Sequence, residues 1–220
     1  MSESLRGELA MTSADWYFDF VSPFPYLQLE QLRGAQGTLR LRPKPVLFAA
    51  LLDHWGTKGP GEIASKRTFV YRHVQWIADR QGIALRFPPR HPFNPLRALR
   101  LAIAIGNDLD AIRAIYGFIW AEGGEIDTEE GWRKLCARLE VADADARVDS
   151  PEVKQRLRAN GEEAIAAGVF GVPTLMIDGH LFWGSDATAM ALDYVRDRGL
   201  FDTPEMRRID TLPIGASRAR

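Results

Sequence analysis

The chain has 220 residues, is 46% hydrophobic and carries a formal net charge of −1 at pH 7. This length allows one sizeable hydrophobic core, and the balanced charge argues against nucleic acid or an anionic membrane surface as a partner. The sequence shows no apolar run that could span a membrane, no signal peptide within residues 1–13 and a single cysteine, Cys136, so we expect a cytoplasmic protein without intramolecular disulfides.

The first predicted elements are a strand over residues 15–20 and a helix over residues 23–33. Aromatic residues alternate along the strand, as they do in a half-buried sheet. Ser22 is expected at the N-cap and Pro23 in the first turn of the helix, which ends at Gly34. Backbone amides and the helix dipole favour an anion at this junction, although the simpler interpretation is that Ser22 only caps the helix.

A second strand over residues 39–42 completes a β-α-β unit, which predicts a parallel pair with a right-handed crossover. A long helical section over residues 46–167 follows. It includes a loop over residues 53–61 that is rich in glycine, and a helix over residues 62–81. Residues 87–95 contain four prolines and form a stiff crossing segment before further helices.

The sheet resumes after the helical section. Asp178-Gly179 predicts a type I′ turn between two apolar runs, and therefore a β-hairpin. Ser185-Asp186 is expected to open the last helix. The order β-α-β, helices, β-β-α is the thioredoxin plan interrupted in the middle, and in that plan a cis peptide bond joins Val172 to Pro173.

These elements predict an α/β, thioredoxin-like fold that is interrupted by a large all-helical insertion. The thioredoxin-like domain is expected to be discontinuous, formed by residues 15–45 and 168–200. The insertion is expected over residues 46–167, and residues 1–14 and 203–220 are expected to be irregular tails.

Three motifs, in this order around a helical insertion, make the chain similar to the 2-hydroxychromene-2-carboxylate isomerase family. That family is related to the kappa-class glutathione transferases and to the DsbA-type thiol oxidases. The motifs are Phe18-Asp19-Phe20-Val21-Ser22-Pro23 with Tyr26-Leu27, Gly171-Val172-Pro173-Thr174, and Phe182-Trp183-Gly184-Ser185-Asp186. Residues 66–83 and 93–100 resemble further segments, so the resemblance covers about residues 15–197.

The resemblance implies glutathione as the cofactor. DsbA-like proteins carry Cys-x-x-Cys where this chain has Ser22-Pro23-Phe24-Pro25, which excludes dithiol exchange at this position. Ser22 is instead the predicted catalytic residue, because its hydroxyl and the helix N-terminus can stabilise a bound thiolate. The implied cofactor-binding residues are Ser22, Val172, Pro173, Trp183, Gly184, Ser185 and Asp186.

Each end of glutathione has a predicted partner. The backbone of Val172 would bind its peptide-like middle in the manner of an added strand. Asp186 would bind the γ-glutamyl amine, and the amides of Ser185 and Asp186 at the start of the last helix would bind the neighbouring carboxylate. Simple helix capping is the alternative for Ser185-Asp186.

In the resembling isomerases the thiolate adds reversibly to the chromene ring, the ring opens, a bond rotates, and elimination gives the isomer. The expected substrate, a small aromatic carboxylate or another electrophile, requires a cation nearby. The predicted substrate-binding residues are Phe24, Lys58, Asn94, Arg97 and Arg100, with Lys58 preferred because its glycine-rich loop can fold over a ligand. We also expect a homodimer, and no ligand cluster predicts a metal site.

Several positions depart from the family pattern. Phe69, His73 and Trp76 stand where the family commonly has Tyr, Asp and Arg, and Ala187 stands where an Arg often follows. The glutathione side of the site is therefore kept and the second-substrate side is altered. Two alternatives to the isomerase follow, namely a kappa-like transferase that conjugates glutathione to electrophiles and a non-catalytic thioredoxin-like binding module.

Overall fold

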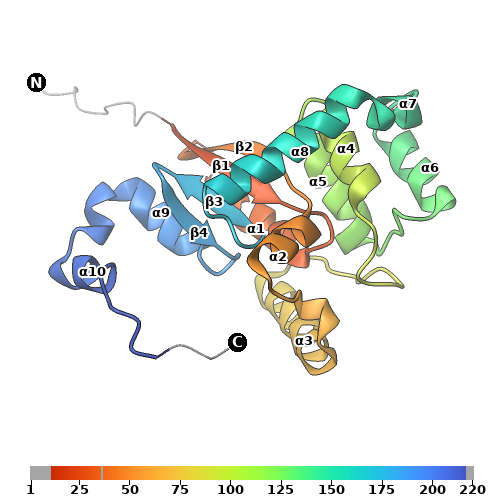
Figure 1. Cartoon of the computed structure of the whole chain (residues 1–220). Helices are drawn as coiled ribbons and strands as arrows, with labels where there is room; N and C mark the ends of the chain where they lie inside the picture. The colour runs from red at the N-terminus through yellow and green to blue at the C-terminus, as the bar shows by residue number, and fades with distance from the viewer. Residues whose placement is uncertain (1–10, 36, 217–220) are drawn as a thin grey trace, which may run out of the picture.

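A four-stranded mixed sheet forms one side of the molecule and a larger group of helices the other (Figure 1). The computed structural model describes residues 11–35 and 37–216. The strands are β1 (Thr12–Phe18), β2 (Leu39–Pro45), β3 (Thr174–Ile177) and β4 (His180–Trp183), in the order β2-β1-β3-β4. β1 and β2 are parallel, whereas β3 runs antiparallel to both β1 and β4. This arrangement confirms the predicted thioredoxin-like fold.

Helices connect and cover the strands. The helix α1 (Pro23–Gln31) crosses from β1 to β2, and α9 (Thr188–Arg196) and α10 (Pro204–Ile209) follow β4. The α-helices between β2 and β3 form the insertion. They are α2 (Phe48–Trp55), α3 (Ala64–Gln81), α4 (Leu96–Ala104), α5 (Leu109–Tyr116) with its π-helical continuation (Gly117–Ala121), α6 (Glu129–Arg138), α7 (Ala144–Asp149) and α8 (Pro151–Ala166). In Figure 1, α8 returns along the sheet and α3 projects below the rest of the insertion.

The sheet and the insertion share one aromatic core. Trp16 and Phe18 of β1 stack at 4.3 Å between ring centroids, and Phe20 lies 4.7 Å from Tyr116 of α5. All four rings are fully buried. Because such aromatic packing contributes strongly to stability, the insertion is fixed to the end of β1 rather than attached by its connections alone.

Two strand boundaries differ from the prediction. β1 covers Thr12–Phe18 instead of residues 15–20, because its pairing with β2 begins at Thr12 and the chain turns away at Asp19. The predicted tail over residues 1–14 was therefore wrong for Thr12–Ala14, and residues 1–10 lie outside the described part of the chain. β2 continues through Pro43 to Pro45, which an edge strand tolerates because one of its sides needs no backbone donors.

The C-terminal helices also differ. The last predicted helix begins at Thr188 with Ala187 as N-cap, so Ser185 and Asp186 form a turn before it rather than its first turn. The predicted irregular tail over residues 203–220 contains the short helix α10, whose N-cap Thr203 accepts a hydrogen bond from the backbone of Met206.

The hairpin and the cis peptide bond are confirmed. Asp178 and Gly179 have φ values of 50° and 85°, as a type I′ turn requires, and the bond from Val172 to Pro173 is cis. A second cis bond precedes Pro92, which the sequence did not predict. Among the helices that the structure describes, none combines the length and apolar character needed to cross a membrane.

Candidate active site

Ser22 lies at the junction of β1 and α1 with its hydroxyl uncommitted to the helix. Its backbone is extended, with φ −94° and ψ 131°, and within residues 11–35 and 37–216 its side chain accepts no capping hydrogen bond. Pro23 and Pro25 lack an N–H, so Phe24 supplies the one backbone donor among these three positions. A ligand at this helix end would therefore meet the Ser22 hydroxyl and few amides.

Side chains of the insertion hold the loop that precedes Ser22. Three consecutive carbonyls of the loop each accept one hydrogen bond from a ring-bearing side chain. The pairs are Tyr116 Oη with the carbonyl of Asp19 at 3.1 Å, Trp120 Nε1 with that of Phe20 at 2.9 Å, and His91 Nε2 with that of Val21 at 2.7 Å. The position of Ser22 is thus set by residues about 70 to 100 positions away in the chain.

The carboxylate of Asp19 joins the same loop to α2. It is fully buried and accepts hydrogen bonds from the backbone N–H groups of Val21 at 3.0 Å and Phe48 at 2.8 Å. Burial raises the pKa of Asp19 to about 7, and these two hydrogen bonds oppose that rise. Burial therefore moves the titration of this carboxyl from the acidic range toward neutral pH.

His91 is a residue of the site that the sequence did not single out. Its Nδ1 lies 2.5 Å from the hydroxyl of Tyr71, and burial lowers the pKa of the imidazole, which favours the neutral ring. In the sequence His91 was visible only as part of the proline-rich segment. Its contact with Val21 depends on the fold, and no local pattern indicates it.

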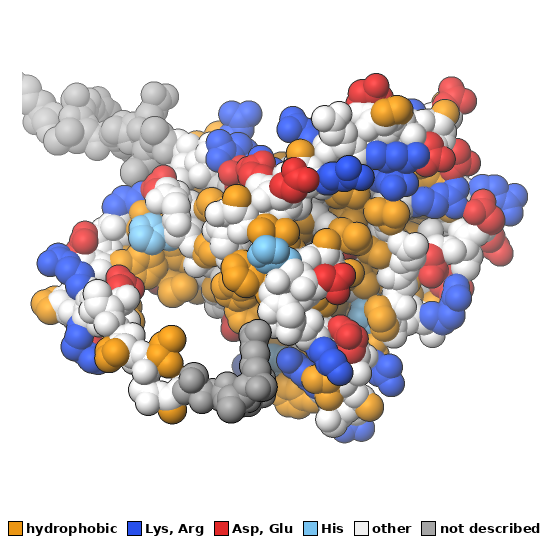
Figure 2. All heavy atoms as spheres, in the orientation of Figure 1, with side chains coloured by type: hydrophobic (Ala, Val, Ile, Leu, Met, Phe, Trp, Pro, Cys, Tyr) orange, Lys and Arg blue, Asp and Glu red, His pale blue; other side chains and the backbone are white. Residues whose placement is uncertain are grey.

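The segment before β3 lies beside the turn that follows β4. The carbonyl of Pro173 accepts a hydrogen bond from Gly184 N at 2.8 Å. Among the described residues, the N–H and C=O of Val172 have no hydrogen-bond partner, so they are available to an extended ligand. Trp183 is half exposed and contacts Phe170 edge to face at 5.0 Å, and Figure 2 shows hydrophobic side chains gathered over the middle of this face, around α2.

Gln28 links this turn to α1. The side chain is fully buried, and its Oε1 accepts from Trp16 Nε1 at 2.8 Å. Its Nε2 donates to the Gly184 carbonyl and to Thr188 Oγ1, both at 3.1 Å. The helix that begins at Ser22 and the turn after β4 are therefore held together by one buried amide.

Ser185 and Asp186 occupy that turn. Gly184 has φ +95°, and a side chain there would collide with the Asp186 carboxylate, so the turn requires glycine. Within the described part of the chain, the backbone N–H groups of Ser185 and Asp186 have no hydrogen-bond acceptor. They can still bind an anion. The sequence had predicted these two residues in the first turn of a helix, whereas in the structure they lie in the turn before it.

Three of the predicted substrate-binding residues lie in or beside loops. Phe24 is partly buried in the first turn of α1, and Lys58 is exposed in the loop after α2. A Cβ added to Gly61 in that loop would lie 3.6 Å from Pro92 Cδ, so the loop approaches the segment that contains His91. The Asn94 side chain accepts from Leu96 N at 3.0 Å and thereby caps α4.

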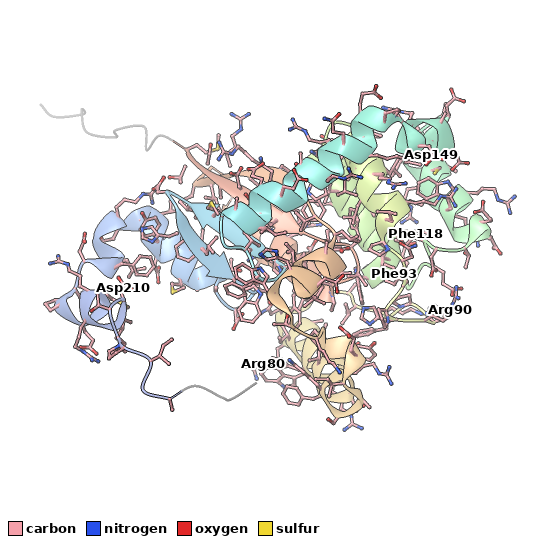
Figure 3. All side chains as sticks on the ribbon, viewed as in Figure 1. Arg80, Arg90, Phe93, Phe118, Asp149 and Asp210 are labelled. Atoms are coloured by element: carbon pink, nitrogen blue, oxygen red, sulfur yellow. The ribbon has the colours of Figure 1, made fainter. Side chains whose placement is uncertain are left out.

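The two predicted arginines are engaged inside the insertion. Arg97 pairs with Glu129 at 2.7 Å and Asp145 at 2.5 Å, and its guanidinium lies 4.3 Å above the ring of Trp132. Arg100 lies 3.6 Å from Asp149, which Figure 3 labels at the α7 end of the molecule. These pairings leave the prediction that Arg97 or Arg100 binds the substrate without support.

Three of the residues that depart from the family pattern, Phe69, His73 and Trp76, form a stripe on α3. His73 stacks between Phe69 at 5.6 Å and Trp76 at 6.0 Å, and Arg80, labelled in Figure 3, lies 5.3 Å from the Trp76 ring. Phe69 is 65% and Trp76 56% exposed. These side chains therefore cover the outer surface of α3 and do not contribute to the core.

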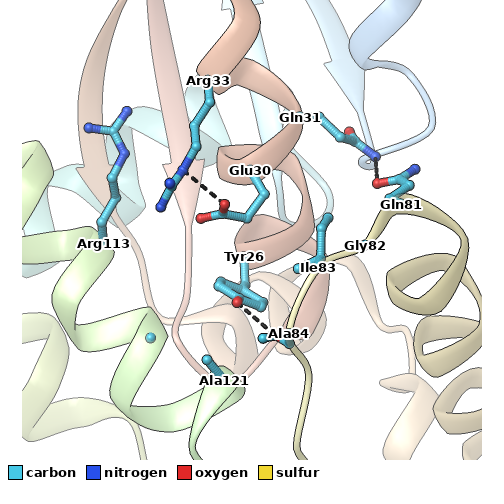
Figure 4. Close-up of a pocket in the computed structure, with 11 residues that line it drawn as sticks. Tyr26, Glu30, Gln31, Arg33, Gln81, Gly82, Ile83, Ala84, Arg113 and Ala121 are labelled. Carbon is cyan, nitrogen blue, oxygen red and sulfur yellow. Dashed lines mark hydrogen bonds and ion pairs between the residues drawn. The ribbon is translucent and has the colours of Figure 1, made fainter.

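A hollow of about 750 Å³ lies beside the C-terminal half of α1, away from Ser22 (Figure 4). Its polar lining groups pair with one another, because Glu30 contacts Arg33 at 2.8 Å and Gln31 donates to Gln81 at 3.2 Å. The Tyr26 hydroxyl, also in the lining, donates to the Ala84 carbonyl. The hollow thus joins α1 to the end of α3 and offers few free groups for chemistry.

Within the part of the chain that the structure describes, no group of three or more His, Cys, Asp or Glu residues could hold a metal ion. Cys136, on α6, is partly buried, and burial raises the pKa of its thiol. It is therefore a poor nucleophile.

Known proteins are similar to this chain in sequence and in fold. The chain is 28% identical over 206 residues to glutathione S-transferase kappa 2 of Caenorhabditis elegans, covering 83% of this chain and 91% of that one. It is 29% identical over 194 residues to a 2-hydroxychromene-2-carboxylate isomerase of Sphingobium xenophagum, covering 83% and 97%. A solved 2-hydroxychromene-2-carboxylate isomerase has a TM-score of 0.72 at 23% identity, covering 91% of this chain and 100% of that one.

A family match spans both parts of the fold. Residues 14–196, from within β1 to the end of α9, match the family described as DSBA-like thioredoxin domain. The match includes the sheet, the Ser22 junction and the whole helical insertion. The chain therefore belongs to the DSBA-like thioredoxin domain family.

Proposed function

We propose that the protein is a glutathione-dependent isomerase of small aromatic carboxylates of the 2-hydroxychromene-2-carboxylate type. The observation that carries the proposal is the free hydroxyl of Ser22 at the N-terminus of α1, where DsbA-like proteins carry a cysteine. Relatives of similar length that are named as such isomerases support the choice of reaction.

The residues predicted to bind glutathione suit it in chemical type. Val172 offers unpaired backbone groups for the peptide part, and the turn at Ser185-Asp186 offers two N–H donors for a carboxylate beside an exposed carboxylate for an amine. Gln28 holds this turn at a fixed place relative to α1. Bound glutathione would supply a thiolate nucleophile that adds reversibly to the substrate ring.

The residues of the chain then have separate tasks. The Ser22 hydroxyl donates to the thiolate and lowers its pKa, and each pKa unit corresponds to about 1.4 kcal/mol. Phe24 contacts the aromatic substrate, and Lys58 pairs with its carboxylate. In this division residues 15–45 and 168–200 bind glutathione, whereas the insertion over residues 46–167 provides the far wall. We also propose that the protein is a homodimer in the cytoplasm. Sedimentation of the purified protein tests the dimer.

A kappa-like glutathione transferase is the second candidate. The 28% identity to glutathione S-transferase kappa 2 supports this candidate. So does the stripe of Phe69, His73 and Trp76 on α3, because these residues differ from those expected on the second-substrate side of an isomerase. A transferase would consume glutathione in stoichiometric amounts, whereas an isomerase would regenerate it.

Two measurements test the proposal. Calorimetry with millimolar glutathione should show binding, and its absence would leave only the binding-module alternative. Turnover of 2-hydroxychromene-2-carboxylate should then be followed together with the concentration of free thiol. A ring-opened product at constant thiol supports the isomerase, whereas thiol loss that matches product formation supports the transferase.

A further inference from the structure

The peptide bond that precedes Ser22 is fixed at both of its polar atoms. Its carbonyl, from Val21, accepts a hydrogen bond from His91 Nε2 at 2.7 Å. Its N–H, from Ser22, donates to the Asp19 carbonyl at 3.2 Å. Because a peptide unit is planar, these two bonds set the orientation of the plane that ends at the Ser22 Cα. The direction of the Ser22 hydroxyl depends on that plane.

The protonation of His91 follows from its partners. A carbonyl oxygen can only accept, so Nε2 must carry the proton. Burial favours the neutral ring, in which Nδ1 is the acceptor, and the Tyr71 hydroxyl lies 2.5 Å from Nδ1 and 3.0 Å from the His91 carbonyl. The Val21 carbonyl therefore selects the tautomer, and the Tyr71 hydroxyl holds the other side of the ring. Both ring nitrogens are used in this arrangement, so His91 has no nitrogen left to exchange protons with a substrate.

Neighbouring rings hold the imidazole in place. Its centroid lies 5.4 Å from that of Trp120, 5.9 Å from that of Phe93 and 6.2 Å from that of Phe87. Trp120 also donates to the carbonyl of Phe20, so ring packing and backbone support belong to one unit. A ring that is confined on several sides transmits the geometry of the insertion to the Ser22 loop.

We infer that His91, oriented by Tyr71, is a positioning residue that directs the Ser22 hydroxyl toward a bound thiolate. The inference rests on the proposed function, because it concerns the same site. In this role His91 contacts neither the thiol nor the substrate. Its effect is on the hydrogen bond that Ser22 can donate, and therefore on the thiol's acidity rather than on glutathione affinity, to which Val172 and the Ser185-Asp186 turn contribute separately.

The experiment compares His91→Phe, which keeps a ring but removes the donor, with Tyr71→Phe, which removes only the orienting hydroxyl. His73→Phe, an exposed histidine on α3, is the matched control. An ultraviolet absorbance titration gives the pKa of the bound glutathione thiol, and calorimetry gives its Kd. His91→Phe should lower the thiolate fraction at a fixed pH by about three- to tenfold, Tyr71→Phe should lower it by about twofold, and Kd should change less than threefold.

A second background separates positioning from general damage to the fold. In Ser22→Ala, which has no hydroxyl to position, His91→Phe should no longer change the thiol pKa. An equal shift of the thiol pKa in the Ser22→Ala background would overturn the inference. So would an unchanged thiol pKa together with a lowered Tm when His91→Phe is made in the protein that keeps Ser22. If the wild-type protein binds no glutathione, the proposed function fails first. Amide hydrogen exchange at Ser22 in the free protein then decides, because His91→Phe should accelerate it and unchanged exchange would overturn the positioning role.

Discussion

Gln28 and Gly184 are 156 positions apart, yet the Gln28 side chain donates to the Gly184 carbonyl at 3.1 Å. The contact joins α1, which begins at Ser22, to the turn that presents Asp186. Gln28 is not proposed to contact the ligand. The distance between Ser22 and the Ser185-Asp186 turn, the two ends of the proposed ligand site, nevertheless depends on it. A buried residue without any chemistry of its own therefore sets the dimensions of the site.

Replacing Gln28 by leucine tests this dependence. Leucine has a similar volume but leaves Trp16 Nε1 and the Gly184 carbonyl without partners, and each buried unsatisfied group costs about 1–3 kcal/mol. We expect Gln28→Leu to lower the free energy of unfolding by about 3 kcal/mol and to weaken glutathione binding at least tenfold. Gln31→Leu on the same helix should change stability by less than about 1 kcal/mol. Equal effects of the two changes in denaturant unfolding would contradict this role.

The Ser22→Ala change isolates the hydroxyl. Because the side chain makes no capping hydrogen bond, its removal should cost little stability, well under the roughly 1 kcal/mol of a lost N-cap. Glutathione should still bind, but the pKa of its thiol should rise and turnover should fall by about ten- to a hundredfold. A variant that lost about 1 kcal/mol of stability and kept its turnover would return Ser22 to the role of a simple cap.

Signals that act over a few residues made most of the fold predictable. Pro23 in the first turn of α1 and the Asp178-Gly179 turn are both confirmed. Each of them works through its own backbone or a group three positions away, so a single sequence contains the whole interaction. The order of these elements along the chain then predicted the thioredoxin plan.

Contacts between distant residues were not predictable in the same way. The His91 contact with Val21 spans 70 positions, and neither residue carries a local signal for it. Arg97 looked available in the sequence because its partners Glu129 and Asp145 are 32 and 48 positions away. Only the packing of α4 against the second half of the insertion reveals that this charge is already paired.

The raised pKa of Asp19 predicts a pH dependence of stability. In the unfolded chain this carboxyl titrates near 3.8, whereas burial raises the pKa in the fold to about 7. Between these values the folded state keeps a proton that the unfolded state has released. The free energy of unfolding should therefore fall as the pH rises from about 4 to about 7, by up to about 1.4 kcal/mol per pH unit.

The Asp19→Asn variant checks this assignment, because an amide does not titrate. Denaturant unfolding at a series of pH values should show a clearly flatter profile between about pH 4 and pH 7 than the unmodified protein does. Asp15→Asn, which removes a carboxylate of β1 that pairs with Arg42 of β2 at 2.7 Å, should leave the fall in place. A fall of unchanged slope in Asp19→Asn would assign it to another group.

Lys58 provides a test of the second-substrate side. A lost charge-assisted contact to a carboxylate costs roughly 1.5–3 kcal/mol, so Lys58→Met should reduce kcat/KM on an anionic substrate by about ten- to a hundredfold. Glutathione affinity should barely change, because Val172 and Asp186 lie on other elements. Lys66→Met, an exposed lysine on α3, is the matched control. Lost glutathione binding with an intact preference for anions would refute the proposed division of the site.

Arg97 should behave as a structural residue, in contrast to Lys58. Its guanidinium is shared between Glu129 and Asp145 and lies over the ring of Trp132, so no donor is directed toward a substrate near Ser22. Both carboxylates are mostly exposed, and solvent screening limits the value of such pairs. Arg97→Met removes the guanidinium from the Trp132 ring and from both carboxylates and should cost about 1 kcal/mol of stability, measured by denaturant unfolding. The ratio of kcat/KM for an anionic and a neutral electrophile should stay within about twofold. A tenfold loss confined to the anionic substrate would instead show that Arg97 leaves its carboxylates to bind the ligand, and would restore the role expected from the sequence.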